Sequence, residues 1–357
     1  MRWSELPDIS WRRFSSTYRR CASRRAKKHG ARWFRHTRNA YYKGESGMRY
    51  RKAVATGAQD MAVDVQSGGA VPRTIRGVVR DLINVTKPGI TMSNAMMTFV
   101  GIWLSAGRHP AFSLAMMTLA GSSLVVMGGC AMNNFMDRDI DQLMTRTKKR
   151  PLPNQRLSGW SVISLGALLA FLGVALLCVY VNLLSAVMAL IGLFFYVIVY
   201  TGLTKRTTTL STVIGSVSGA MPPLIGWTAM SGTLSTGAWL LFLFMFIWQP
   251  PHFWALSMRR VKEYAAARIP LLPVKYGFAP TKRQIVAWTV LLVPVSLLLY
   301  VAHVTDVFYL ISALLLGGVW IVKALRGLRA KDDIAWATEM FKFSLIYLTG
   351  MAAAMVI

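Results

Sequence analysis

Long, nearly unbroken apolar stretches dominate the chain from Lys87 onward, and short polar or charged stretches separate them. A helix of about 20 apolar residues crosses the hydrocarbon core of a bilayer. Backbone groups inside lipid must also satisfy their own hydrogen bonds, which favours helices. The pattern therefore predicts an all-α integral membrane protein with nine transmembrane helices. The expected spans are 88–107, 112–133, 158–180, 183–202, 210–230, 237–256, 285–304, 307–325 and 338–357.

Positive charge alternates between the loops that join these spans. One set of loops is crowded with Lys and Arg: 138–156, 205–206, 259–283 and 323–331. The other set holds a single Lys or Arg: 108–109, 181–182, 231–236 and 303–306. Because positively charged loops stay in the cytoplasm, we expect the first set and the amino terminus on the inside. The expected location is the cell membrane, either the bacterial inner membrane or, alternatively, the mitochondrial inner membrane.

Composition agrees with a membrane protein and argues against a nucleic-acid partner. The 357 residues are 54% hydrophobic and only 15% charged, and the mean hydropathy is +0.42. The net charge of +27 lies in the amino-terminal segment and in the short loops, where charge that sets membrane topology is found. The three cysteines stand far apart and show no spacing typical of a metal site.

Residues 1–60 form a basic arm that is separate from the apolar spans. The first 52 residues contain sixteen Lys and Arg and three acidic residues, with no continuous apolar region of a signal peptide. The arm loosely resembles an organelle transit segment. Two other interpretations are a disordered arm lying on anionic lipid and a start site placed too early, with Met48 or Met61 as the true start. We expect residues 61–86 to form a juxtamembrane segment before the membrane domain at 87–357.

An acidic motif follows the second span directly: Asn133, Asp137 and Asp141 are spaced four residues apart. On a helix these positions share one face, which drifts about 40° per step. The two carboxylates repel each other unless a cation lies between them. Mg²⁺ takes carboxylate, amide and water oxygens and leaves positions for phosphate oxygens. We therefore expect a metal–diphosphate clamp here, and the alternative is that these are ordinary solvated loop charges.

Basic side chains accompany this motif in the positively charged loops. One guanidinium group can bind phosphate oxygens through two parallel N–H groups. We therefore expect these basic side chains to contact a diphosphate head group. The basic residues are Arg146, Lys148, Lys149, Arg150, Lys205 and Arg206. For Lys205 and Arg206, a role in membrane topology alone is the alternative.

Glu263 and Tyr264 follow the sixth span among several cations. Glu263 is expected to be a second metal ligand or a partner for a cation. Tyr264 is expected to donate a hydrogen bond to phosphate or to stabilise a cation through its ring face. The alternative for Tyr264 is an ordinary tyrosine at the membrane interface. Together with Trp227 and Phe253, it is a candidate for shielding a reactive cation.

The sequence around these residues resembles the UbiA-type intramembrane prenyltransferases, and within that family it is similar to the haem O synthase branch. The likeness extends from about Lys87 to Ile357. Its segments are Asn133 to Pro153, Tyr200-Thr201 with Lys205-Arg206, Gly215 to Trp227, Trp248 to Phe253, and Glu263 to Val274. The wider family carries a second aspartate-rich motif after the sixth helix, where this chain offers only Glu263.

The resemblance implies nine transmembrane helices around a central cavity with a cytoplasmic mouth. It also implies Mg²⁺-dependent transfer of farnesyl from farnesyl diphosphate to a vinyl group of protohaem IX (haem B), giving haem O and diphosphate. Carried over by position, Asn133, Asp137 and Asp141 hold Mg²⁺ and diphosphate, and the arginines and lysines neutralise phosphate charge. Haem A synthase or terminal oxidase assembly factors are the protein partners that this reaction suggests.

His252 lies at the cytoplasmic end of the sixth span. An ionisable residue within a span is a functional candidate. The resemblance places His252 on the haem side, where it would ligate iron, bind a propionate or move a proton. The alternative is an interfacial histidine bonded to backbone. The residues expected to be catalytic are thus Asp137, Asp141, His252 and Tyr264, with Glu263 beside them.

Three other functions compete with this interpretation. The first is a related prenyltransferase that acts on an aromatic quinone precursor. The second is a polytopic transporter, because polar spans and a proline-broken helix also suit alternating access. The third is a non-catalytic haem-handling protein. The acidic residues cluster at the cytoplasmic edge rather than at the membrane midplane, which argues against the transporter.

Overall fold

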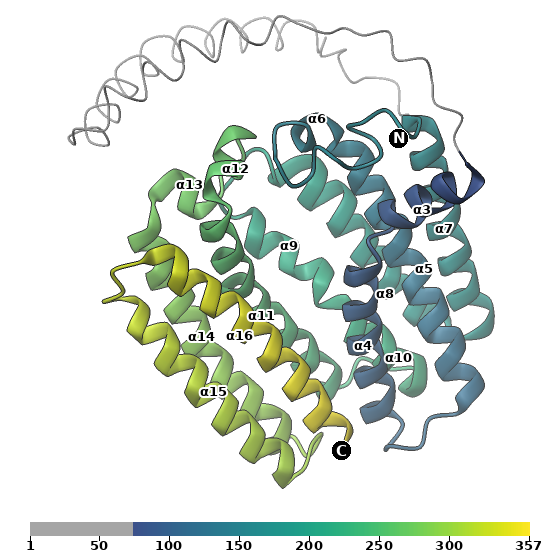
Figure 1. Ribbon diagram of the computed structural model, residues 1–357. Helices are drawn as coiled ribbons and strands as arrows, with labels where there is room; N and C mark the ends of the chain where they lie inside the picture. The colour runs from purple at the N-terminus through teal and green to yellow at the C-terminus, as the bar shows by residue number, and fades with distance from the viewer. Residues whose placement is uncertain (1–73) are drawn as a thin grey trace, which may run out of the picture. The chain divides into compact units, whose positions relative to one another are not determined.

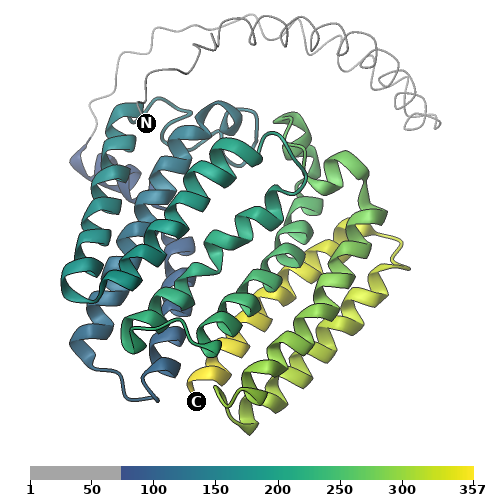
Figure 2. The same cartoon turned by 180° about the vertical axis from the view of Figure 1, so that it is seen from behind.

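The computed structural model describes residues 74–357, and every regular element in this part of the chain is a helix, which confirms the predicted all-α class. The helices are α3 (Ile75–Val85), α4 (Pro88–Ser105), α5 (Phe112–Met136), α6 (Arg138–Asp141), α7 (Gly159–Tyr180), α8 (Leu183–Phe194), η1 (Phe195–Thr204), α9 (Ser211–Gly219), α10 (Met221–Ser231), α11 (Thr236–Arg259), α12 (Val261–Ala266), α13 (Leu272–Tyr276), α14 (Phe278–Val301), α15 (Val307–Gly327) and α16 (Asp333–Val356). Figures 1 and 2 show them from opposite sides. The arm predicted at 1–60 lies outside the described residues.

Within the described part, seven helical segments are long and apolar enough to cross a membrane. They are α5, α7, α8 with η1, α11, α14, α15 and α16. The other two predicted spans correspond to α4 and to α9 with α10. The chain is a multi-pass membrane protein, and the count of nine spans stays a prediction.

The predicted span at 210–230 breaks into α9 and α10. The break lies at Ala220, which caps both helices. Pro222 and Pro223 follow in the first turn of α10, where the missing backbone N–H needs no helical partner. A broken helix persists inside a membrane where it faces protein or a cavity. The end of α9 is therefore a place to look for a ligand.

The fourth predicted span also changes its winding part-way, since η1 is a π-helix that continues α8. The Lys205 N–H donates to the Tyr200 carbonyl, five residues back, at 2.8 Å. The Thr201 hydroxyl likewise donates to the Tyr196 carbonyl at 2.8 Å. Such wide turns are often found at functional sites.

Glycines let two pairs of helices approach closely. A Cβ added at Gly128 of α5 would lie 2.6 Å from the carbonyl oxygen of Gly166 in α7. A Cβ added at Gly226 of α10 would lie 2.0 Å from the carbonyl oxygen of Thr98 in α4. Membrane helices associate through such small residues because lipid supplies little hydrophobic driving force between helices. These contacts fix α4 and α5, which carry several of the residues described below.

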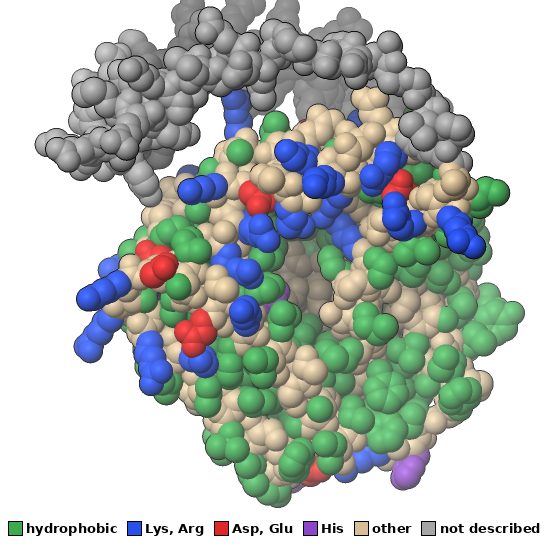
Figure 3. Space-filling model, in the orientation of Figure 1, with side chains coloured by type: hydrophobic (Ala, Val, Ile, Leu, Met, Phe, Trp, Pro, Cys, Tyr) green, Lys and Arg blue, Asp and Glu red, His purple; other side chains and the backbone are tan. Residues whose placement is uncertain are grey.

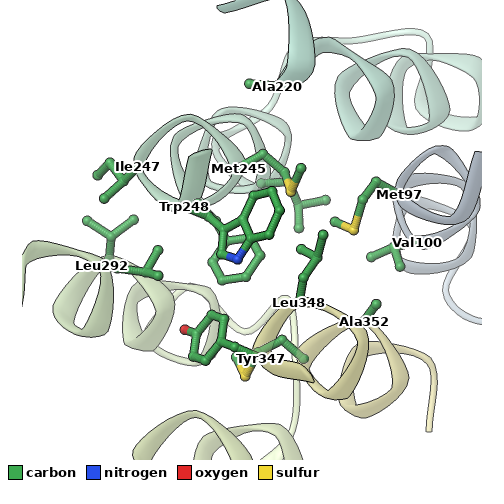
Figure 4. Close-up of a cluster of buried hydrophobic side chains, with 14 of the residues drawn as sticks. Met97, Val100, Ala220, Met245, Ile247, Trp248, Leu292, Tyr347, Leu348 and Ala352 are labelled. Atoms are coloured by element: carbon green, nitrogen blue, oxygen red, sulfur yellow. The ribbon is translucent and has the colours of Figure 1, made fainter. Parts of the chain in front are cut away.

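An apolar core joins α11, α14 and α16 on the other side of the bundle. Figure 4 shows Trp248, Leu292 and Tyr347 pointing toward one another from these three helices. The Trp248 Nε1–H donates to the backbone carbonyl of Ser344 at 3.0 Å. This bond satisfies the buried indole and sets α11 against α16.

Candidate functional site

A cavity of about 610 Å³ lies inside the bundle, within the range of small-molecule sites. Residues of α4, α5, η1, α9, α11 and α16 line it. Figure 3 shows a hollow in this face of the molecule beneath a concentration of Lys and Arg side chains. The cavity therefore combines a positively charged mouth with a mainly apolar interior, which suits an amphipathic ligand with an anionic head.

The acidic motif lies at this mouth. Asn133, Asp137 and Asp141 all line the cavity, and all are buried, at 3%, 2% and 2% exposed. The backbone bonds from Asp137 N to Asn133 O and from Asp141 N to Asp137 O keep the helical repeat across the junction of α5 and α6. The i, i+4, i+8 spacing therefore places the three side chains on one face, as the sequence predicts.

Each buried carboxylate has its own basic partner. The Lys205 ammonium pairs with Asp137 Oδ2, which also accepts a hydrogen bond from Asn133 Nδ2 at 2.9 Å. Arg150 pairs with Asp141 at 2.7 Å and reaches the side chain of Asn134 at 3.3 Å. The repulsion expected between the two acids is thus offset by two cations at the same mouth.

One oxygen of the motif has no hydrogen-bond partner. Asp137 Oδ1 is buried, and no donor among the described residues reaches it within hydrogen-bonding distance. A buried carboxylate oxygen without a donor is costly unless a cation or water meets it. The chemistry of this donor set, carboxylates and an amide, suits Mg²⁺. The described residues contain no cluster of three or more His, Cys, Asp or Glu placed to hold a metal, so other ligands would have to complete the shell.

Lys87 is a member of the site that sequence reasoning missed. Its ammonium donates to Asn133 Oδ1 at 2.5 Å, while the amide of Asn133 also donates to the Thr201 hydroxyl at 3.0 Å. Burial lowers the pKa of Lys87 to about 8. Lys87 directly precedes Pro88 at the start of a span, where a lysine commonly serves only to set membrane topology. Its position in the sequence therefore did not mark it as a residue of the site.

The other predicted phosphate-binding residues divide into two groups. Arg146, Arg150 and Lys205 line the cavity, whereas Lys149 is exposed and lies outside its lining. Arg206 is also outside the lining, and it donates two hydrogen bonds to the Asp139 carboxylate, at 2.6 and 2.7 Å. Hydrogen bonding to Arg206 lowers the pKa of Asp139, and the same bonding raises the pKa of Arg206.

Glu263 and Tyr264 take different positions although they are adjacent. Glu263 pairs with Arg260 at 2.9 Å and lies outside the cavity lining, which fits the predicted cation partner rather than a metal ligand. Tyr264 is buried in the lining, with its ring centroid 6.5 Å from that of Phe253. Burial raises the pKa of the Tyr264 hydroxyl, so it stays protonated at neutral pH. Trp227, considered with these rings, lies outside the cavity lining and packs against Gly237 instead.

His252 faces the cavity from α11, between the rings of Trp248 and Phe341 at centroid distances of 4.7 and 4.9 Å. Its Nδ1 lies 2.6 Å from the Ser344 hydroxyl, which donates its own hydrogen to the Phe341 carbonyl at 2.6 Å. The shared hydrogen bond therefore requires Nδ1 to be the donor. In the neutral ring, Nε2 then carries a free lone pair, because none of the described residues bonds to it.

Comparison with known proteins places most of the described part of the chain in one family. The model of the UbiA prenyltransferase family matches residues 94–346. The chain is 49% identical to the protoheme IX farnesyltransferase of Alkalihalophilus pseudofirmus over 283 residues, covering 78% of this chain and 89% of that protein. It is 47% identical to the protein of the same name from Geobacillus kaustophilus, covering 80% and 92%. Protoheme IX farnesyltransferase 2 of Bacillus subtilis is 44% identical, with coverage of 78% and 92%.

Solved structures share the fold at low sequence identity. A digeranylgeranylglyceryl phosphate synthase superposes with a TM-score of 0.67 at 19% identity, covering 78% of this chain and 97% of that one. A UbiA homologue from Archaeoglobus fulgidus, bound to DMAPP and Mg²⁺, superposes with a TM-score of 0.55 at 12% identity, covering 77% and 99%. These likenesses show a common helical architecture.

Proposed function

Since this chain belongs to the UbiA prenyltransferase family, we propose that it transfers the farnesyl group of farnesyl diphosphate to a vinyl group of protohaem IX (haem B), producing haem O and diphosphate. Relatives named for that activity, 44–49% identical over most of the chain, support the choice of substrates. The observation that carries the proposal is the buried face of Asn133, Asp137 and Asp141 at the basic mouth of a mainly apolar cavity.

The residues at the mouth fit a diphosphate and its metal. Asp137 and Asp141 would hold Mg²⁺ with Asn133 beside them. Asp137 Oδ1 accepts no hydrogen bond and has the Arg206 guanidinium 4.0 Å away, so it is the atom that most needs such a cation. Bound there, Mg²⁺ would neutralise the charge that develops on the diphosphate leaving group. A UbiA homologue whose structure contains DMAPP and Mg²⁺ supports a metal-dependent reaction.

The cations around the motif would bind the phosphate oxygens. Lys205 and Arg150 each pair with a carboxylate at the mouth, and Arg146 and Lys87 also line the cavity. On diphosphate binding, these basic groups would exchange a carboxylate partner for phosphate oxygens. Arg206 would act indirectly: it binds Asp139 and the Met136 carbonyl, at 2.7 Å, and so holds the turn that carries the acids.

The aromatic and histidine side chains would serve the acceptor and the reactive carbon. Tyr264 and Phe253 present ring surfaces near the mouth, which would stabilise positive charge on the prenyl group. His252 would face the porphyrin with its Nε2 lone pair, available to iron or to a proton. The apolar lining would exclude bulk water while the bond to diphosphate breaks.

The basic loops support a cytoplasmic mouth in a cell membrane, where both substrates are accessible. The haem O product is hydrophobic and would be passed on within the membrane. Haem A synthase or terminal oxidase assembly factors are therefore the protein partners that we propose.

Mass spectrometry of extracted haems tests this function. Cells that lack haem O should accumulate it when they produce this protein, and not when they produce the Asp137→Asn variant. Membranes given labelled farnesyl diphosphate and either haem or a hydroxybenzoate would separate the haem acceptor from a quinone precursor. Label found only in the hydroxybenzoate product would contradict the proposal.

A further inference from the structure

The short helix α3, which precedes α4, presents faces with different surroundings. Asp81 and Val85 lie on the face that packs on the protein, and they are only 6% and 2% exposed. Ile75, Val79 and Ile83 lie on a second face, at 83%, 48% and 53% exposed. These three side chains are spaced four residues apart, so they form one stripe along the helix. The described part of the chain therefore leaves an apolar stripe of α3 open.

Two arginines border this stripe. Arg76 and Arg80 are exposed, and each lies about 100° round the helix from a residue of the stripe, on the side away from the packed face. Neither forms an ion pair with a described residue. The one acidic residue of α3, Asp81, is paired instead with Arg156 at 3.0 Å. The open surface of α3 is therefore apolar along one side and positively charged along the next.

The packed face fixes α3 against the end of α5 that carries the acidic motif. Val85 packs with Ala131 of α5 and Val162 of α7. The side-chain amide of Asn134 donates to the Val85 carbonyl at 2.6 Å. The open surface is thus part of the packed domain at the level of the cavity mouth.

The chain changes direction between α3 and α4. Lys87 joins the two helices with a positive φ of 52°, and Pro88 then begins α4. Figure 1 shows α3 lying at an angle to α4 instead of continuing it. With 11 residues, α3 is about 16 Å long, which is too short to cross the hydrocarbon core. A helix in this position runs along the membrane surface at the mouth end of the bundle.

We propose that α3 is an interfacial helix that binds anionic lipid headgroups through Arg76 and Arg80 while its apolar stripe enters the outer part of the acyl region. An apolar face bordered by basic residues is typical of helices that lie in this interface. Arginine side chains are long enough to keep their charge among the lipid phosphates while their stems cover apolar surface. The inference does not depend on the proposed function.

Spin labels on the full chain, reconstituted into vesicles, test the position of α3. The three native cysteines are replaced by alanine, and one label is attached at Val79→Cys or Asn84→Cys. Residue 79 lies on the stripe, whereas the exposed residue 84 lies about 140° round the helix. Oxygen concentrates in the bilayer and a neutral nickel chelate in water, so the oxygen-to-chelate collision ratio should be severalfold higher at residue 79.

Two outcomes of this measurement overturn the inference. One is a label at residue 79 that meets the chelate as readily as the label at residue 84. The other is a label at residue 79 that is shielded from both reagents, because protein would then cover the stripe, either residues 1–73 or a second copy of the chain.

The lipid composition tests the role of the arginines. The ratio at residue 79 should rise by about fivefold when a third of the phosphatidylcholine is replaced by phosphatidylglycerol. The Arg76→Gln/Arg80→Gln variant should lose this rise. Lys148→Gln/Lys149→Gln is the matched control, since it removes two exposed positive charges from another loop and should keep the rise. No rise without these substitutions, or an equal rise in the arginine variant, overturns the inference.

Discussion

The two polar regions of the cavity differ in how their groups are satisfied. At the mouth, Asp137 and Asp141 each have a basic partner, and the region is held together by charge. At the contact between α9 and α11, Thr212, Ser216 and Gln249 also line the cavity but are neutral, and hydrogen bonds to backbone carbonyls hold this region together. A region built from opposite charges can release its cations to an incoming anion. A neutral region held by hydrogen bonds to backbone carbonyls has no cation to release, and it holds α9 against α11.

The largest effect is expected from neutralising the mouth. Asp137→Asn keeps the side-chain volume but removes the charge that meets Lys205 and the metal, so farnesyl transfer should fall by about a thousandfold or more. Haem O formed by membranes, normalised to the protein detected by immunoblot, provides the measurement. Asp332→Asn, at the cap of α16 and outside the cavity lining, is the control. Activity within tenfold of wild type would remove Asp137 from the proposed clamp.

Removing the cation should affect stability as well as activity. Lys205→Met leaves Asp137 buried without its ammonium partner, and the free energy of unfolding should fall by about 3 kcal/mol. The double variant Asp137→Asn/Lys205→Met buries no unpaired charge and should recover most of that loss while remaining inactive. Thermal unfolding in detergent, followed beside the activity assay, checks both statements. A double variant as unstable as Lys205→Met would show that the pairing does not explain the loss.

A smaller effect is expected where the backbone of α9 approaches Gln249 of α11. Gly219→Ala places a methyl group 2.1 Å from Gln249 Oε1, so the amide must move. Overpacking of this kind costs about 1–3 kcal/mol, which should lower the unfolding temperature measured in detergent. Gly318→Ala is the matched control, since a Cβ there meets nothing within 4 Å. Equal unfolding temperatures for the two variants would contradict the close contact.

The smallest effect is expected at the exposed pair beside the mouth. Asp139→Asn breaks the pair with Arg206, which is partly exposed and screened, and should cost less than about 1 kcal/mol. Because Arg206 lowers the pKa of Asp139, the pair stabilises the fold above the ordinary carboxyl range, and this contribution is lost as the pH falls through the lowered pKa. The variant and the wild type should therefore differ equally at pH 6 and pH 8, and converge in acid. A difference that grows between those two pH values would contradict the assignment.

The charged region was largely predictable from sequence, and the neutral region was not. Acidic residues four apart beside a dense basic loop are rare at the end of a membrane span, so Asp137 and Asp141 stood out. Thr212 and Gln249 resemble the polar residues that occur within many membrane spans. Their significance depends on the break after α9 and on the space at Gly219, which are tertiary features.

The apolar pattern of the sequence predicted where the long helices lie. It did not predict local changes in helical winding, such as the π-helix η1. The apolar stretches located α5 and α7 to within a few residues, whereas α14 begins at Phe278, seven residues before the predicted 285, because its first turns are polar. No apolar pattern announces the π-helical winding of η1, since α and π turns bury similar residues. The sequence also did not show which carboxylate Arg206 pairs with. Asp137 and Asp139 are both within reach, and the turn at α6 places Asp139 closer.

The wide winding of η1 has a consequence for how this segment tolerates a change in length. A π turn takes up more residues than an α turn, so losing one residue between 195 and 204 would let the segment relax to ordinary α geometry. The span would still cross the bilayer, and its apolar character would hardly change. Lys205, however, would swing round the helix axis and away from the acids. A single-codon deletion that looks harmless in a hydrophobicity profile should therefore inactivate the protein without preventing its insertion into the membrane.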